Sequence, residues 1–104
     1  MAIELYSKSN LNEIEHFGYL NYEELVVLRM ISEKLGLACL QFLPYGGDII
    51  FNSEQAHHIF KNEIPLLEKN VDHTIKIGET IKLLKRASEI VSSQSHTVLV
   101  IEGD

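Results

Sequence analysis

The sequence has few cysteines, few basic residues and no long apolar run, and each shortage excludes a class of protein. Its single cysteine, Cys39, cannot form an internal disulfide, which is typical of a reducing compartment. Nine lysine and arginine residues stand against 15 acidic ones, for a formal charge of −6. Nucleic acids and anionic membranes are bound by basic surfaces, so neither is an expected ligand. A basic protein is the partner that this charge favours.

Apolar residues are present in ordinary amount but never in a long stretch. Residues 98–101 form one of the longer runs, whereas a helix needs roughly 20 apolar residues to cross a bilayer. Residues 1–5 lack the basic and apolar regions of a secretory signal. The 104 residues, 45% of them hydrophobic and 23% charged, fit one globular domain over 1–104. We therefore expect a single cytoplasmic domain without a membrane segment.

Motifs that identify enzymes and metal sites are also missing. Gly46 and Gly47 are not followed by the Lys-Ser/Thr of a P-loop, and no Gly-x-Ser-x-Gly occurs. His57 and His58 are adjacent, which places them about 100° apart on a helix and prevents paired metal binding. Cys39 lies in an apolar run, so we interpret it as a small buried hydrophobe. We expect no catalytic residue, no metal and no cofactor.

Two helices are predicted with defined ends. Asn21 is a typical N-cap, Gly36 suits the left-handed residue after a helix, and an apolar stripe at helical spacing lies between them. These features predict a helix over residues 22–35. A second apolar stripe, with basic residues and Glu89 mostly on the opposite side, predicts a helix over residues 78–92, and a start as early as His73 fits the same pattern.

Two further helices are predicted from shorter patterns. Asn10 and Glu13 fit a capping box, and apolar residues follow at three-residue steps, which predicts a short helix ending before Gly18. A cap at residues 52–53 starts another helix. Pro65 must either kink that helix or begin a new one, because proline lacks the amide hydrogen that a helix interior uses.

The remaining apolar segments predict strands. Residues 3–6 alternate, residues 37–43 are too short for a buried helix, and residues 48–51 follow a Pro/Gly turn. We interpret residues 37–51 as a β-hairpin. Residues 97–101 are β-branched without alternation, which predicts a buried C-terminal strand that is covered on both faces. Together these elements predict an α+β fold, with a small mixed or antiparallel sheet of about four strands packed with three to four helices.

The negative charge is concentrated in the first two thirds of the chain. Residues 1–68 hold ten acidic and four basic side chains, whereas residues 69–104 hold five of each. Tyrosines stand next to several acids, and aromatic anchors rimmed by charge are typical of protein interfaces. This chemistry predicts an acidic surface for a basic partner, and the alternative is a solvated surface that only confers solubility. The candidate partner-binding residues are Glu13, Glu15, Tyr19, Tyr22, Glu23, Glu24, Tyr45 and Asp48.

In size, charge and surface texture the chain resembles the immunity proteins of bacterial contact-dependent growth inhibition and related polymorphic toxin systems. The segments that carry this resemblance are residues 19–24, Tyr-Leu-Asn-Tyr-Glu-Glu, and residues 44–48, Pro-Tyr-Gly-Gly-Asp. The resemblance implies a non-catalytic protein that binds a basic toxin one to one, often a nuclease such as an RNase, and blocks its active site. It also implies a chain that is monomeric until the toxin binds.

Two other functions are compatible with the same residues. A small enzyme or ligand-binding domain would use histidines such as His57 or His73 with a nearby glutamate, because active sites assemble in space rather than in sequence. A homo-oligomeric regulatory subunit would instead pair through a strand edge or an apolar helix face. The size of the free protein in solution separates this last function from an immunity protein, which we expect to be monomeric.

Overall fold

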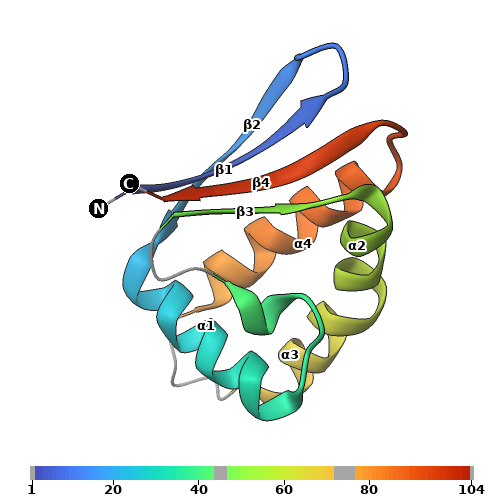
Figure 1. Ribbon diagram of the computed structural model, residues 1–104. Helices are drawn as coiled ribbons and strands as arrows, with labels where there is room; N and C mark the ends of the chain where they lie inside the picture. The colour runs from blue at the N-terminus through green and yellow to red at the C-terminus, as the bar shows by residue number, and fades with distance from the viewer. Residues whose placement is uncertain (1, 44–46, 72–76, 104) are drawn as a thin grey trace.

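The computed structural model describes residues 2–43, 47–71 and 77–103, and these form two layers (Figure 1). The strands are β1 (Ala2–Ser9), β2 (Ile14–Asn21), β3 (Asp48–Phe51) and β4 (Thr97–Gly103). They form one antiparallel sheet in the order β2-β1-β4-β3. The helices lie on one face of this sheet (Figure 1). The predicted α+β class and the small sheet of four strands are therefore confirmed.

Both helices predicted with defined ends are present. Asn21 Oδ1 accepts a hydrogen bond from the Glu24 amide at 3.1 Å, and Gly36 has a left-handed φ of 67°, so both ends of α1 are confirmed. The helix over residues 78–92 is α4, which contacts β1, β2 and β4. The helix layer contains α1 (Tyr22–Leu35), the 3₁₀ helix η1 (Leu40–Phe42), α2 (Ser53–His58), the π-helix η2 (Ile59–Glu63), α3 (Ile64–Asn70) and α4 (Gly78–Ser92).

The core lies between the sheet and the helices. Leu5 of β1 is opposite Ile101 of β4, and both are fully buried. Leu84 of α4 is buried in the same cluster. Because β4 lies between β1 and β3, its residues are covered by strands on both sides, and even Val100, which points away from Ile101, is only 5% exposed. The predicted burial of the C-terminal strand is confirmed, but the expected covering of both its faces is wrong, because the described helices lie on one face of the sheet.

The segment before β3 does not form a strand, so the predicted hairpin over residues 37–51 is wrong. The segment forms a turn and η1, and β3 pairs with β4. The physical reason is the spacing of its apolar residues. Leu37, Leu40 and Leu43 recur every three residues and are all buried, whereas Phe42 is exposed. A 3₁₀ helix has about three residues per turn, so this spacing places one side of the segment against the core.

The first predicted helix, before β2, is also wrong, because its residues form the turn of a hairpin between β1 and β2 and the start of β2. Ser9 Oγ accepts hydrogen bonds from the amides of Leu11 at 3.2 Å and Glu13 at 3.1 Å. Asn12 has a φ of 63°, which belongs to a turn. Leu11 is 75% exposed, so the three-residue spacing of apolar residues does not reflect burial here.

The helical run from α2 to α3 changes geometry rather than stopping. Asn52 and Gln55 form a reciprocal capping box with hydrogen bonds of 2.8 and 2.9 Å, which confirms the predicted start of this run. Pro65 lies in the first turn of α3, as predicted, where a missing amide hydrogen costs little. The π-helix η2 precedes it and ends at the buried Glu63.

Gly18 lies at a bulge in β2, and its missing side chain makes room for α4. The register between β1 and β2 shifts between Leu5 and Tyr6, which leaves Phe17 as an extra residue. Gly18 has a φ of 150°, and a Cβ built on it would lie 3.1 Å from Leu83 Cδ2. A larger residue at this position would therefore strain the backbone and press on α4.

We expect Gly18→Ala to lower the free energy of unfolding by about 1–3 kcal/mol, because of the strained φ and the contact with Leu83. Gly78→Ala is the matched control, since Gly78 begins α4 and a Cβ built there meets nothing within 4 Å. The control should leave stability unchanged or raise it by up to ~1 kcal/mol. Urea unfolding followed by circular dichroism measures both, and equal effects would contradict the role of the bulge.

Candidate docking surface

We call the face of the sheet that points away from the helices the open face. Ile3 and Leu5 of β1 are buried against the helix layer, so Glu4 between them points the opposite way. The pairing register then assigns the residues of the other strands to the same face. The open face consists of Glu4, Tyr6, Lys8, Ile14, His16, Tyr19, Asp48, Ile50, Val98, Val100 and Glu102.

Three carboxylates, Glu4, Glu102 and Asp48, lie side by side on the open face, and we call them the acidic row. Glu4 of β1 is directly opposite Glu102 of β4, which is directly opposite Asp48 of β3. Tyr19 of β2 continues the row on the other side of Glu4 and is 71% exposed. Like charges at directly opposite positions of neighbouring strands destabilise a sheet. The stability of the sheet therefore does not explain the acidic row.

Two neighbouring side chains partly compensate the acidic row. Tyr6 Oη donates a hydrogen bond to Glu102 Oε2 at 2.7 Å, and His16 Nδ1 lies 2.7 Å from Glu4 Oε1. The rings of Tyr6 and His16 pack with their centroids 5.8 Å apart. Asp48 is exposed and has no ion-pair partner within the described part of the chain. The row thus keeps carboxylate oxygens that a cationic group could use.

Tyr6 acts as a hydrogen-bond donor on the open face. Its hydrogen bond to Glu102 raises the pKa of Tyr6 from 10.0 to about 12, and partial burial and the charges of Glu102, Glu4 and Asp48 add to the shift. The phenol therefore stays protonated at neutral pH, whereas a base or nucleophile would need the phenolate. Its role is to hold the Glu102 carboxylate on the open face.

Apolar side chains lie beside the acidic row. Ile50 is two residues from Asp48 on the same face of β3 and is 59% exposed. Ile14 near the hairpin turn is 55% exposed. Val98 and Val100 of β4 lie between the outer strands on this face. An exposed apolar group next to unpaired charge is the composition of a protein interaction surface.

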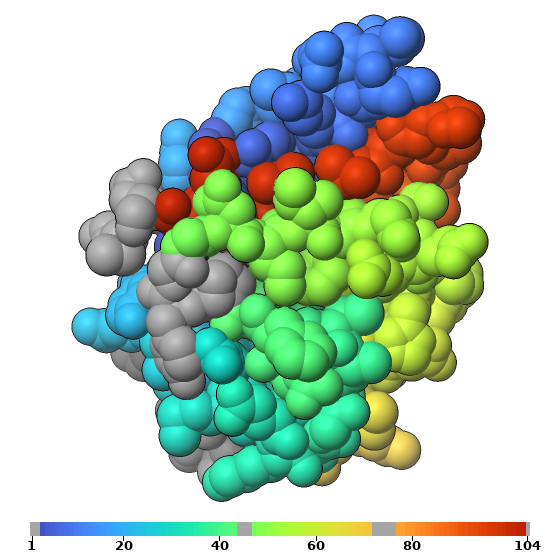
Figure 2. Space-filling view, in the orientation of Figure 1, coloured from blue at the N-terminus to red at the C-terminus, as the bar shows by residue number. Residues whose placement is uncertain are grey.

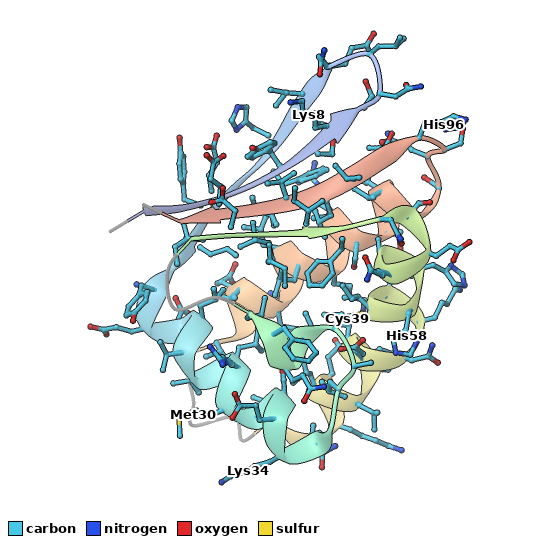
Figure 3. The ribbon with its side chains drawn as sticks, in the orientation of Figure 1. Lys8, Met30, Lys34, Cys39, His58 and His96 are labelled. Atoms are coloured by element: carbon cyan, nitrogen blue, oxygen red, sulfur yellow. The ribbon has the colours of Figure 1, made fainter. Side chains whose placement is uncertain are left out.

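The open face continues onto a hairpin that extends past the helix layer. Figure 2 shows β1 and β2, in blue, projecting at one end of the molecule. Figure 3 shows Lys8 on this hairpin, at the opposite end of the molecule from Met30 and Lys34 of α1. The helix side has exposed apolar residues of its own, which belong to three different elements: Met30 of α1, Phe42 of η1 and Leu66 of α3.

Three of the eight residues predicted to bind a partner belong to strands of the sheet, and a fourth lies in the turn between β1 and β2. Tyr19 and Asp48 lie on the open face. Asp48 is one end of the acidic row, and Tyr19 is next to Glu4 at its other end. Glu13 lies in the hairpin turn. Glu15 of β2 is opposite Ser7, so it lies on the helix side of the hairpin. The structure therefore brings Tyr19 and Asp48 onto one surface and places the other two behind it.

The other four lie elsewhere. Glu23 and Glu24 are in the first turn of α1, where carboxylates stabilise the positive end of the helix dipole. Tyr22 is partly buried and packs against the core. Tyr45 lies outside the described residues.

Of the open face, sequence reasoning predicted only Tyr19 and Asp48, and the residues that it missed include Glu4, Tyr6, His16 and Glu102. The alternation over residues 3–6 already places Glu4 and Tyr6 on one face of a strand. Glu102 joins them only through the pairing of β1 with β4, which the sequence does not specify. His16 falls in the segment wrongly predicted as a helix. The bulge there also breaks the alternation of side chains between the two faces of β2, so no regular strand pattern marks His16.

A second cluster of titratable side chains lies in the helix layer around Glu63, which is 1% exposed. The Glu63 carboxylate accepts hydrogen bonds from the Leu40 amide at 2.9 Å and the Cys39 amide at 3.1 Å. His58 Nε2 lies 3.2 Å from Oε2 of the same carboxylate. Figure 3 shows Cys39 and His58 close together on the helix side of the sheet. The carboxylate thus satisfies the amides at the start of η1, which would otherwise be buried without partners.

The chemistry of this cluster is structural. Burial raises the pKa of the Cys39 thiol from 9.0 to about 12, and the charge of Glu63 and a hydrogen bond to it add to the shift. Because a nucleophilic cysteine needs a lowered pKa, Cys39 is an inert buried side chain, as predicted. His57 is exposed on α2, and His73 lies outside the described residues.

No family model, curated protein or solved structure matches the chain. Among the described helices, none has the length and apolar character needed to cross a membrane. In the same part of the chain, no three His, Cys, Asp or Glu side chains are grouped to hold a metal ion. The function must therefore be inferred from the chemistry of the surface.

Glu63→Gln should lower the free energy of unfolding by about 2–4 kcal/mol, because an amide NH₂ would face donors in a buried site. Glu89→Gln is the control, because Glu89 is exposed on α4 and its loss should change stability by less than about 0.5 kcal/mol. Chemical denaturation of both variants measures the difference. A Glu63→Gln protein as stable as the control would contradict the capping role.

The raised pKa of Cys39 also predicts a pH dependence. A thiol whose pKa is higher in the folded state favours folding fully below pH 9.0, and this contribution is lost as the pH rises toward 12. We expect the stability of the wild-type protein to fall more steeply than that of Cys39→Ala between pH 9 and pH 11. We also expect iodoacetamide to label Cys39 at pH 8 only after denaturation. Rapid labelling of the native protein would contradict the assignment.

Proposed function

We propose that the chain is a non-catalytic inhibitor of the immunity-protein kind, which binds a basic toxin through the open face. The observation that carries this proposal is the acidic row, in which Glu4, Glu102 and Asp48 are adjacent on an uncovered sheet. Nucleases hold phosphates with lysine and arginine side chains, and a row of carboxylates is complementary to such a surface. A nuclease such as an RNase is therefore the toxin class that fits best.

The charge of the chain supports fast association with such a partner. The formal charge is −6, and the excess of acids lies before Lys69. Complementary charge steers two proteins together and raises the association rate by about 10- to 1,000-fold at low ionic strength. Affinity for the toxin should therefore fall as salt is added, because exposed charges are screened.

Exposed side chains beside the acidic row supply the anchors that charge alone does not. Tyr19 is 71% exposed and Ile50 is 59% exposed, and they lie on opposite sides of Glu4 and Glu102. Most of the binding energy of an interface comes from a few such aromatic or apolar residues. We infer that Tyr19 and Ile50 enter hollows on the toxin while the carboxylates pair with its basic residues.

The enzyme hypothesis has less support. The thiol of Cys39 and the phenol of Tyr6 both have pKa values raised to about 12, so neither is an activated nucleophile or base at neutral pH. His16 is paired with Glu4, but neither residue lines any of the four hollows of about 210–550 Å³ in the described part of the molecule. A substrate held in one of these hollows would not meet these groups.

A homo-oligomer is the second candidate, because Ile14 and Ile50 are exposed and β2 and β3 are edge strands. Pairing two open faces would bring two acidic rows together, and like charges at an interface oppose association. Light scattering of the free protein tests this alternative. We expect a monomer, and a stable dimer would favour the regulatory-subunit hypothesis.

Asp48→Lys should weaken binding of the toxin about 10-fold or more, because it reverses the exposed end of the acidic row. Tyr19→Ala should cause a loss of similar size by removing an anchor. The test partner is found by sequencing the genes that flank this one and expressing a basic toxin-like C-terminal domain encoded there, and titration calorimetry at two salt concentrations measures the affinity. Protection of cells that express this domain is the second readout.

Glu89→Lys is the matched control, because it makes the same change of charge on α4, away from the sheet. It should retain nearly full affinity. Equal losses for Asp48→Lys and Glu89→Lys would show that only total charge matters, which would contradict the open-face assignment. Failure of the wild-type chain to bind the toxin or to protect cells would contradict the proposed function itself.

A further inference from the structure

A polar hollow of about 490 Å³ lies on the helix side of the projecting hairpin, behind the open face. One wall is the hairpin, and the other is the turn between α4 and β4. Ser7 is opposite both Glu15 of β2 and Leu99 of β4, which places it on the face that the core occupies further along the sheet. The side chains that matter for its chemistry are Ser7, Ser9, Glu13, Glu15, Ser95 and Thr97.

The hollow exists because the helix side of the hairpin changes from apolar to polar. Along β1 the residues on this side are Ile3 and Leu5, and then Ser7 and Ser9. The helix α4 ends at Ser92, so it does not continue beneath the hairpin. A hairpin that only completed the core would carry apolar residues here. The polar residues instead line a space that is open to a ligand.

The Ser7 hydroxyl faces the hollow without a partner in the described part of the chain. The residue is 3% exposed, and its hydroxyl has no hydrogen-bond partner within the part of the chain that the structure describes. Fully buried side-chain oxygens and nitrogens of the described residues all have partners, so the Ser7 oxygen must retain access to the hollow that it lines. Nearly buried polar groups are normally satisfied, and a ligand in the hollow would satisfy this one.

The charge of the hollow selects a cation. Glu13 and Glu15 line it, and neither has an ion-pair partner among the described residues. No basic side chain is among its lining residues. The hydroxyls of Ser9 and Thr97 are already used, as an acceptor for the turn amides and as a donor to the Ser95 carbonyl. Two carboxylates and the Ser7 oxygen thus remain as free acceptors.

We propose that this hollow binds a guanidinium group, such as the side chain of an arginine. A guanidinium presents five N–H donors in a plane, so it can bond the Ser7 oxygen and the two carboxylates of the hairpin wall at once. An ammonium group is compact and strongly hydrated, and it suits a smaller site. The site is independent of the proposed toxin binding, because it lies on the other side of the sheet from the acidic row.

The probe is ethylguanidinium chloride, titrated into ¹⁵N-labelled full-length protein, with ethylammonium chloride at the same ionic strength as its comparison. We expect saturable shifts of the amide resonances of Ser7, Glu15 and Ser95 with ethylguanidinium. Glu13→Gln/Glu15→Gln should weaken binding about 10-fold or more, since it removes both charges from exposed positions without disturbing the core. Glu89→Gln on α4, outside both the hollow and the acidic row, is the control and should not change the affinity.

Two results would overturn the proposal. One is a shift that rises linearly and equally with both salts, and the other is an unchanged affinity in the double glutamine variant. Two further probes, N-acetyl-L-arginine amide and agmatine, distinguish the source of the group. Tighter binding of the arginine derivative supports a protein side chain as the ligand, and tighter binding of agmatine supports a small guanidino compound. Toxin binding by the double variant tests the proposed function separately.

Discussion

The four-stranded sheet is packed against helices on one face only. Each strand therefore carries two kinds of side chain, and β1 shows both: Ile3 and Leu5 enter the core, while Glu4 and Tyr6 remain outside. The helix layer buries the apolar side chains of the sheet, such as Ile3 and Leu5. The opposite side holds adjacent carboxylates that repel one another, and no described element covers them. A sheet covered by its own helices on both faces could not keep such residues.

The interior uses its ionisable groups for structure. Glu63 satisfies the amides of Cys39 and Leu40 and contacts His58, which holds η1 and the η2 helix together across a long sequence separation. A buried carboxylate is costly unless it is paired and hydrogen-bonded, and this one has both kinds of partner. The cluster that most resembles a catalytic set is thus committed to the fold. The groups that remain free to act on other molecules lie on the surface of the sheet and hairpin.

The sequence predicts those elements whose ends are marked by local chemistry. Asn21 and Gly36 mark α1 because caps act within a few residues. Leu37, Leu40 and Leu43 were ambiguous, since seven apolar-rich residues suit either a strand or a 3₁₀ turn until the core is known. The acidic row could not be predicted, because Glu4, Glu102 and Asp48 become neighbours only through pairing between distant strands. Tyr19 and Asp48 are predicted to bind a partner from their surface chemistry alone, and the structure places both on the open face.

The proposed function requires the open face, and not the helix side, to contact the partner. Cross-saturation from the protonated toxin to methyl groups of the deuterated chain tests it most directly, because each side carries exposed methyl groups. The account predicts loss of signal at Ile14, Ile50 and Val98 on the open face, with Met30 and Leu66 on the helix side unaffected. Saturation of Met30 and Leu66 with no effect at Ile50 would contradict it.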